Sequence, residues 1–127
     1  MTQEQELMIK KAEEFLAAAK FNLQGEQYGT VLNRAYYAVF TCSQLMLFLE
    51  GITVKTHAGN HRKFNETFIK TDLILKKYGR MLNELYELRQ ATDYDAFSFA
   101  EKEDAEEAYS KAASFLEMTN KWLTDKE

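Results

Sequence analysis

The sequence predicts an all-α protein, an up-and-down four-helix bundle with one additional short helix. Its 127 residues contain no proline and five glycines, too few turn-forming residues for a fold of many short strands. Along most of the chain, apolar residues recur at steps of three and four, which is the period of a helix with one buried face. At this length we expect one helical domain over residues 1–127, large enough to fold without a metal or a disulfide.

The first two helices are predicted to be long. A helix over residues 3–24 presents one apolar stripe, and Gly25 is expected to end it. The members of that stripe are Met8, Ala12, Phe15, Ala19 and Leu23. A helix over residues 27–50 is apolar around much of its circumference, so we expect it at the centre of the core, with Gly51 after its end.

Three more helices are predicted in the second half of the chain. A short helix covers residues 58–70, and Thr71 with Asp72 is expected to cap a helix over residues 73–91. The buried stripe of the helix over residues 73–91 consists of Leu75, Tyr78, Leu82 and Leu85. After a loop over residues 92–99, the last helix is expected to begin near a capping box formed by Ser98 and Glu101. Short connections make neighbouring helices antiparallel, which gives the bundle.

The composition excludes several classes of protein. No apolar run reaches the ~18 residues that a membrane span needs, and the N-terminus is polar and acidic, unlike a signal sequence. The single cysteine, Cys42, excludes a disulfide framework and a zinc site with several thiolates. The chain also lacks a glycine-rich phosphate loop. We therefore expect a cytoplasmic protein with no membrane association and no cofactor.

Positive charge gathers in the middle of an acidic chain. Residues 51–80 carry seven basic and two acidic groups, although the net charge of the whole chain is −4. The candidate patch for nucleic acid or another anion consists of Lys55, His57, Arg62 and Lys63, and Arg34 from the preceding helix is a further candidate for binding the anion. The alternative is a chance scatter of composition. His57 and His61 are four residues apart, but two nitrogens leave a tetrahedral metal half-ligated, so the sequence predicts no metal site.

Arg89 is out of place on an apolar face. It lies four residues after Leu85 and so continues the buried stripe of its helix. Asp93 and Tyr94 follow four and five residues later, and all three side chains can meet if the helix persists or turns tightly. One interpretation is an internal Arg–Asp pair that closes the helix, and the other is a functional group of cation, carboxylate and phenol.

Arg34 is a second charge in an apolar environment. It lies in the middle of the predicted central helix, and Tyr37 and Thr41 share its face. A charge there must be paired or must face a cleft, because burying an unpaired ion is expensive. We predict that Arg34 is paired with a carboxylate and borders the cleft that contains Arg89.

Four stretches of the chain together resemble a known family. They are Arg34-Ala-Tyr-Tyr-Ala-Val-Phe40, Gly51 with Lys55-Thr-His57-Ala-Gly59, Phe64 through Phe68-Ile-Lys70, and Leu88-Arg89-Gln-Ala-Thr-Asp93-Tyr94. In order and spacing they resemble the HEPN domain, and within it the small stand-alone prokaryotic proteins of the toxin–antitoxin type. The resemblance covers about residues 7–120.

The resemblance implies a helical bundle that forms a homodimer and has a minimal nucleotidyltransferase as its antitoxin partner. It also implies a metal-independent endoribonuclease whose motif is an arginine followed, after four to six residues, by a histidine, with two copies meeting at the dimer interface. The arginine falls on Arg89. No histidine follows it, because His57 and His61 both lie upstream, and Asp93 and Tyr94 occupy the region instead.

Two main functions stay open. The first is an RNA-cleaving toxin in which Arg89, Asp93 and Tyr94 form the catalytic group. His57 on a neighbouring helix is one candidate for the missing histidine, and the sequence does not decide whether it reaches the site. The second is a dimeric binding module that partners a nucleotidyltransferase and holds RNA or a nucleotide without cutting it. The resemblance also makes Tyr94 a candidate for nucleotidylation, since some relatives are regulated at a tyrosine beside the motif. A third interpretation is a structural bundle with no ligand.

Overall fold

The computed structural model describes residues 1–95 and 99–126, and these form helices and connections without a strand. The elements in chain order are α1 (Gln3–Gln24), α2 (Tyr28–Leu49), α3 (His57–Phe64), the π-helical segment η1 (Asn65–Ile69), α4 (Lys76–Tyr94) and α5 (Lys102–Lys126). The predicted all-α bundle is therefore confirmed. No helix in the described part of the chain has the length and hydropathy that a membrane span requires.

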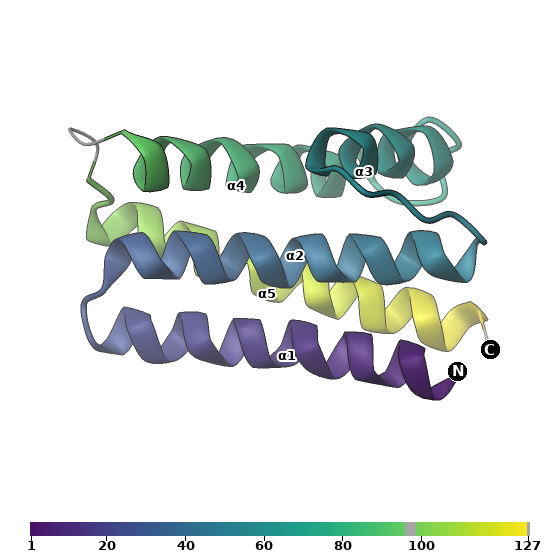
Figure 1. Cartoon of the computed structure of the whole chain (residues 1–127), viewed down its shortest axis with the longest axis horizontal. Helices are drawn as coiled ribbons and strands as arrows, with labels where there is room; N and C mark the ends of the chain where they lie inside the picture. The colour runs from purple at the N-terminus through teal and green to yellow at the C-terminus, as the bar shows by residue number, and fades with distance from the viewer. Residues whose placement is uncertain (96–98, 127) are drawn as a thin grey trace.

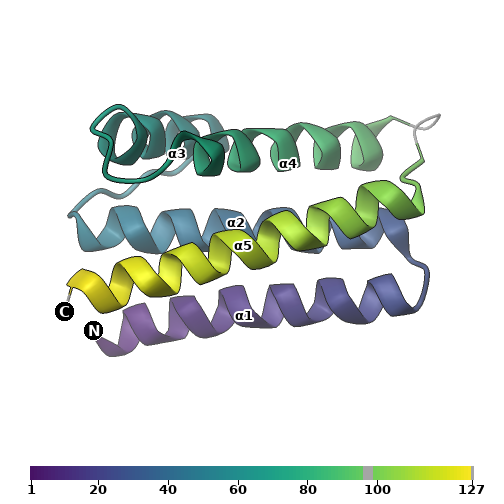
Figure 2. The same ribbon diagram turned by 180° about the vertical axis from the view of Figure 1, so that it is seen from behind.

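The helices are arranged around α2. In Figures 1 and 2, α2 and α5 lie side by side in the middle, with α1 on one side and α3 and α4 on the other. α1 and α4 run in the opposite direction to α2 and α5, so the bundle alternates up and down, and the two chain ends lie together. Because α2 contacts α1, α3, α4 and α5, its broad apolar circumference is used on every side.

Two kinds of packing fill the core. Small side chains line the contacts of α1 and α5 with α2, where they allow the helices to approach closely, and they include Ala12, Ala35, Ala108 and Ala112. Between η1, the start of α4 and α5, rings pack against one another with centroids 5.2 to 5.9 Å apart. We call this group the phenylalanine cluster, and its members are Phe64, Phe68, Tyr78, Phe115 and Trp122.

The ends of α1 and α2 follow the sequence closely. α1 has the predicted bounds and begins with a reciprocal capping box between Thr2 and Gln5. Gly25 caps its end as expected, but the left-handed residue in this turn is Glu26, with a φ of 60°. α2 is one residue shorter at each end than predicted, and Gly51 after it adopts a φ of 77°, which favours glycine.

The predicted cap at Thr71 and Asp72 is wrong. The Thr71 hydroxyl donates to the Thr67 carbonyl, and Asp72 has a φ of 60°, so both residues belong to the turn that leaves η1. The N-cap of α4 is Leu75, which makes no side-chain cap and is 67% exposed rather than part of the buried stripe. The short helix also differs from the expectation, since it begins at His57 and widens to a π-helix at Asn65.

The predicted loop over residues 92–99 is wrong at its start. α4 continues through Thr92 and Asp93 to Tyr94, which keeps these residues in register with Arg89. α5 begins at Lys102, and the backbone N–H of Glu101 donates to the Asp104 carboxylate. Ser98, the other half of the predicted capping box, lies outside the described residues.

Gly79 inside α4 has a packing reason. A Cβ at this position would lie 2.7 Å from the Asn65 side-chain oxygen and 3.1 Å from a side-chain carbon of Ile69. The glycine therefore allows α4 to pass close to η1, which offsets the helix propensity that glycine loses relative to alanine.

Candidate functional site

Arg89 is a buried cation near the end of α4. Arg89 is only 5% exposed, because it continues the stripe of Leu82 and Leu85 that faces α2. Removing a guanidinium from water is expensive, so its surroundings must replace the lost hydration. The neighbours of Arg89 therefore decide what this part of the molecule can do.

Two side chains share one nitrogen of the Arg89 guanidinium. Nη1 of Arg89 lies 3.5 Å from Oδ2 of Asp93 and donates to the Tyr37 hydroxyl at 3.4 Å. Asp93 reaches it because α4 continues for one more turn than the sequence predicts. The Asp93 side chain is 28% exposed, so the pair joins a buried cation to a carboxylate in contact with solvent. The arginine Nε, by contrast, is buried and has no hydrogen-bond partner among the described residues.

Aromatic rings surround the guanidinium. Its central carbon lies 5.2 Å from the ring centroid of Tyr36, 5.3 Å from Tyr37, 5.7 Å from Tyr86 and 5.9 Å from Tyr94. These distances are typical of cation–π contacts, which compensate a cation for part of the hydration it loses. We call Arg89 with these four tyrosines the tyrosine cluster.

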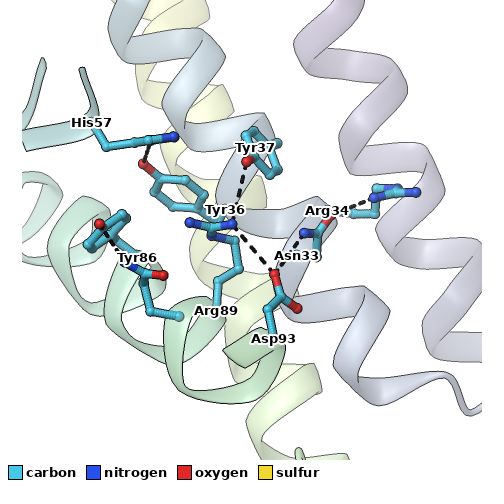
Figure 3. A network of polar contacts seen from close by, with 9 residues as sticks. Asn33, Arg34, Tyr36, Tyr37, His57, Tyr86, Arg89 and Asp93 are labelled. Atoms are coloured by element: carbon cyan, nitrogen blue, oxygen red, sulfur yellow. Dashed lines mark hydrogen bonds and ion pairs between the residues drawn. The ribbon is translucent and has the colours of Figure 1, made fainter. Parts of the chain in front are cut away.

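The two histidines of α3 meet one phenol of this cluster. The hydroxyl of Tyr36, a fully buried residue, lies 2.6 Å from Nδ1 of His57 and 3.1 Å from Nε2 of His61. The His57 ring also packs on Phe40 and Tyr86, with centroids 4.4 and 5.7 Å away. Figure 3 shows His57, Tyr36 and Arg89 converging from α3, α2 and α4.

Burial sets the charge state of these groups. It lowers the pKa of His57, and the positive charge of Arg89 lowers it further. Burial and the neighbouring His57 together lower the pKa of His61 to about 4. The pKa of the Tyr36 phenol is raised by burial, which outweighs the opposing effect of Arg89. At neutral pH both imidazoles and the phenol are therefore uncharged, and Arg89 supplies the positive charge of the site.

An open cleft lies beside the tyrosine cluster. It has a volume of about 610 Å³ and runs from Asp93 and Tyr94 to the connection between α1 and α2. Its wall includes Tyr28, Thr30 and Phe99, and the Tyr94 residue is 74% exposed. This volume is within the range of small-molecule sites, and the lining includes three carboxylates, Glu26, Asp93 and Asp95.

The family follows from comparison with known proteins. The model of the HEPN domain matches residues 5–122 of the chain. The chain belongs to the HEPN domain family. The match begins in the first turn of α1 and includes most of α5, so it covers nearly the whole bundle.

Three relatives are similar over most of their lengths. A Methanocaldococcus jannaschii protein named "Putative toxin" is 37% identical over 123 residues, 97% of this chain and 84% of the relative. A second protein of that organism, similarly named, is 32% identical over 123 residues, 97% of this chain and 91% of the relative. A Thermotoga maritima protein named "UPF0332 protein" is 32% identical over 116 residues, 91% of this chain and 88% of the relative.

The structure places Arg34 differently from the prediction. Its guanidinium donates to the Asn33 side-chain oxygen, and no described carboxylate forms an ion pair with it. Asn33 in turn donates to Oδ2 of Asp93 at 3.2 Å, so Arg34 reaches the site only through an amide. In Figure 3 Arg34 points to the opposite side of Asn33 from Asp93. The predicted carboxylate partner is wrong, because a half-buried arginine on α2 keeps enough contact with water to need none.

The basic residues of the predicted patch are separate from the tyrosine cluster. Glu66 lies 4.0 Å from Nε of Arg62 and 3.4 Å from Nζ of Lys63, and Lys55 is exposed. In the described structure none of these three cations pairs with a member of the cluster. His57, the remaining member of the predicted patch, contacts Tyr36 of the cluster instead. The described residues contain no group of three histidine, cysteine or carboxylate side chains placed to hold a metal.

Sequence reasoning missed three participants. Tyr36 looked like ordinary core, Tyr86 drew no attention, and His61 was considered only as a metal ligand. Tyr86 could have been found, because it lies three residues before Arg89 and so shares its helical face. The convergence of α3 on Tyr36 has no such local signal.

Proposed function

We propose that this HEPN chain, residues 1–127 acting as one cytoplasmic domain, is a toxin component that cleaves RNA without a metal ion. The observation that carries the proposal is the arrangement of Arg89, a buried cation whose paired carboxylate and one of whose covering rings, Tyr94, border a cleft of nucleotide size. The relatives named "Putative toxin" support the toxin part.

The chemistry needs a strong cation. In metal-free cleavage the 2′-oxygen of a ribose attacks the adjacent phosphorus and the 5′-oxygen leaves, which gives a 2′,3′-cyclic phosphate and a 5′-hydroxyl end. The proton of the 2′-hydroxyl is lost to a base, and the leaving oxygen gains one from an acid. Negative charge grows on the phosphoryl oxygens, and the planar fork of Arg89 is suited to hold them.

Asp93 and Tyr94 complete the proposed catalytic group. Asp93 holds the guanidinium until a phosphate competes for it, and its 28% exposure allows that exchange. Tyr94 offers an exposed ring for a nucleobase and a hydroxyl for the phosphate. That exposure also suits the proposed nucleotidylation of Tyr94 by a minimal nucleotidyltransferase antitoxin.

We further propose that the chain forms a homodimer that brings two Arg89 sites together. An isologous interface around Tyr94 would place both copies of the motif along one RNA strand. Lys55, Arg62 and Lys63 would then bind the RNA backbone on either side. Light scattering of the purified protein at micromolar concentration should report twice the monomer mass, and a monomer alone would contradict the dimer.

A second candidate function has its own observation. Arg89 is already paired with Asp93 and covered by four rings, which suits a binding module in which the cation is part of a rigid surface. Such a module would partner a nucleotidyltransferase and hold RNA or a nucleotide without cutting it.

The deciding experiment is cleavage of a fluorogenic RNA oligonucleotide in buffer with a chelator. Wild-type protein should cut it, and Arg89→Ala should lose about 10²–10³ in rate, the usual cost of one preorganised donor to a developing oxyanion. Arg80→Ala is the matched control, because Arg80 is an exposed arginine on the same helix. RNA left intact by wild-type protein, together with tight binding to a nucleotidyltransferase, would favour the binding module.

A further inference from the structure

Two histidines share a single phenolic proton. Nδ1 of His57 and Nε2 of His61 both lie within hydrogen-bond distance of the Tyr36 hydroxyl, at 2.6 and 3.1 Å. A phenol has one proton, so it donates to one of the two nitrogens and accepts from the other. The neutral histidine that donates must carry its proton on the bonded nitrogen, and the one that accepts must carry it on the other. Tyr36 therefore makes the tautomers of His57 and His61 depend on each other.

The proposed RNA cleavage lacks a proton-transfer group on α4. No histidine follows Arg89, and the Asp93 carboxylate is engaged by the guanidinium and by Asn33. His57 is the nearest alternative on structural grounds, since its ring packs on Tyr36, Tyr37 and Tyr86, three of the rings that also surround Arg89. Its one hydrogen bond to a described residue is made through Nδ1, so Nε2 has no hydrogen-bond partner among the described residues.

We propose that His57, carried by α3, is the proton-transfer residue of the Arg89 site, and that Tyr36 and His61 are positioning residues that fix its tautomer. This inference rests on the proposed RNA cleavage. With His61 accepting the Tyr36 proton, the phenol oxygen accepts Nδ1–H of His57, and Nε2 presents its lone pair. That nitrogen takes the proton of the ribose 2′-hydroxyl as the 2′-oxygen bonds to phosphorus. The imidazolium so formed then returns the proton to the leaving 5′-oxygen, which restores neutral His57.

The surroundings of His57 keep it in the form that this role requires. The titratable and charged groups around it are Tyr36 and Tyr37 on α2, His61 on its own helix, and Tyr86 and Arg89 on α4. Burial and Arg89 both lower the pKa of His57, so the neutral ring predominates at neutral pH. The acid limb of the cleavage rate should accordingly lie below the ordinary histidine value of about 6.5.

The first test separates proton transfer from packing. His57→Asn keeps a hydrogen-bonding atom close to the position of Nδ1 but cannot carry a proton, and it should lose about 10²–10⁴ in cleavage rate. Added imidazole should restore part of the rate of His57→Ala, which loss of a structural contact would not allow. If His57→Asn cuts RNA within twofold of wild type while Arg89→Ala does not, the assignment of His57 is overturned and the proposed function stands. Wild-type protein that leaves RNA intact overturns both.

The second test addresses Tyr36 and His61 directly. Nitrogen-15 NMR should show one fixed tautomer for each histidine in wild-type protein and a mixture in Tyr36→Phe, whether or not the sample contains RNA. The cleavage rate of Tyr36→Phe should fall about tenfold, as for a lost orienting hydrogen bond, while Tyr78→Phe in the phenylalanine cluster should match wild type. His61→Gln, which retains a donor and an acceptor, should cut faster than His61→Ala. Unchanged histidine tautomers in Tyr36→Phe would overturn the positioning roles.

Discussion

The two halves of α4 contribute to two aromatic clusters of opposite character. Near its start, Tyr78 packs against Phe115 in the phenylalanine cluster, whose three phenylalanines are fully buried. Cations reach only the half-buried outer rings, where Lys77 lies over Tyr78 and Lys126 over Trp122. Near its end, Tyr86 and Tyr94 lie on either side of Arg89 in the tyrosine cluster. Ring spacings in the first cluster and cation–ring distances in the second are both between 5 and 6 Å.

The two clusters contribute differently to the stability of the protein. Apolar rings packed on apolar rings stabilise the fold through buried area. Rings packed on a cation instead compensate a charge that folding has taken out of water, and they leave little net gain in stability. The tyrosine cluster therefore maintains a positive charge in a fixed place, and the phenylalanine cluster supplies the stability that this requires.

The largest expected effect is loss of a ring from the phenylalanine cluster. Phe115→Ala should lower the free energy of unfolding by about 3–5 kcal/mol, because it leaves a cavity beside Phe64 and Tyr78. Urea denaturation followed by circular dichroism measures this change. Phe99→Ala is the matched control, since Phe99 is 84% exposed and its loss should change stability by less than about 0.5 kcal/mol. Equal costs for the two variants would contradict the comparison.

Replacement of the central cation should cost less. Arg89→Met keeps the volume of the side chain but removes the charge, and we expect the free energy of unfolding to change by about 1 kcal/mol or less. The remaining Asp93 is partly hydrated and still accepts a hydrogen bond from Asn33, so it is not left as a buried unpaired charge. The same urea experiment measures this variant. A loss as large as that of Phe115→Ala would mean that the tyrosine cluster also contributes to stability.

Acid should affect the tyrosine cluster through His61. The pKa of His61 is about 4 in the folded protein and 6.5 in an unstructured chain, so the unfolded state binds more protons between these values. The stability linked to this residue is complete above pH 6.5 and is lost as the pH falls towards 4. The melting temperature of wild-type protein should therefore decrease more steeply over this interval than that of His61→Gln. Parallel curves for the two proteins would argue against a buried neutral His61.

The smallest effect is expected at Arg34. Arg34→Ala removes a hydrogen bond to Asn33 and no ion pair with a described carboxylate, so stability should change by less than about 0.5 kcal/mol. Asn33→Ala is the informative comparison, because Asn33 also contacts Asp93, and its loss should release the Asp93 side chain. Thermal unfolding measures the stability of both variants. A strong loss of stability in Arg34→Ala would instead support the buried ion pair that the sequence predicted for this residue.

The local features of this protein are visible in its sequence. The recurrence of apolar residues predicted the helical class and the bounds of α1, and it came within one residue at each end of α2. It also isolated Arg89, since a charge four residues beyond Leu85 interrupts an otherwise apolar stripe. These features depend on the helical period and on neighbours within one or two turns, which are visible in the chain itself.

Tertiary structure alone decided which charges are buried and which groups meet. The sequence treated Arg34 and Arg89 alike, yet α4 packs its end against α2 and buries Arg89, while Arg34 lies on another side of α2 with access to water. His57 precedes Arg89 by 32 residues, and only the way α3 folds back over α2 brings it against Tyr36 of the tyrosine cluster. Helical periodicity says which residues share a face, but the packing of one helix on another decides what that face contacts.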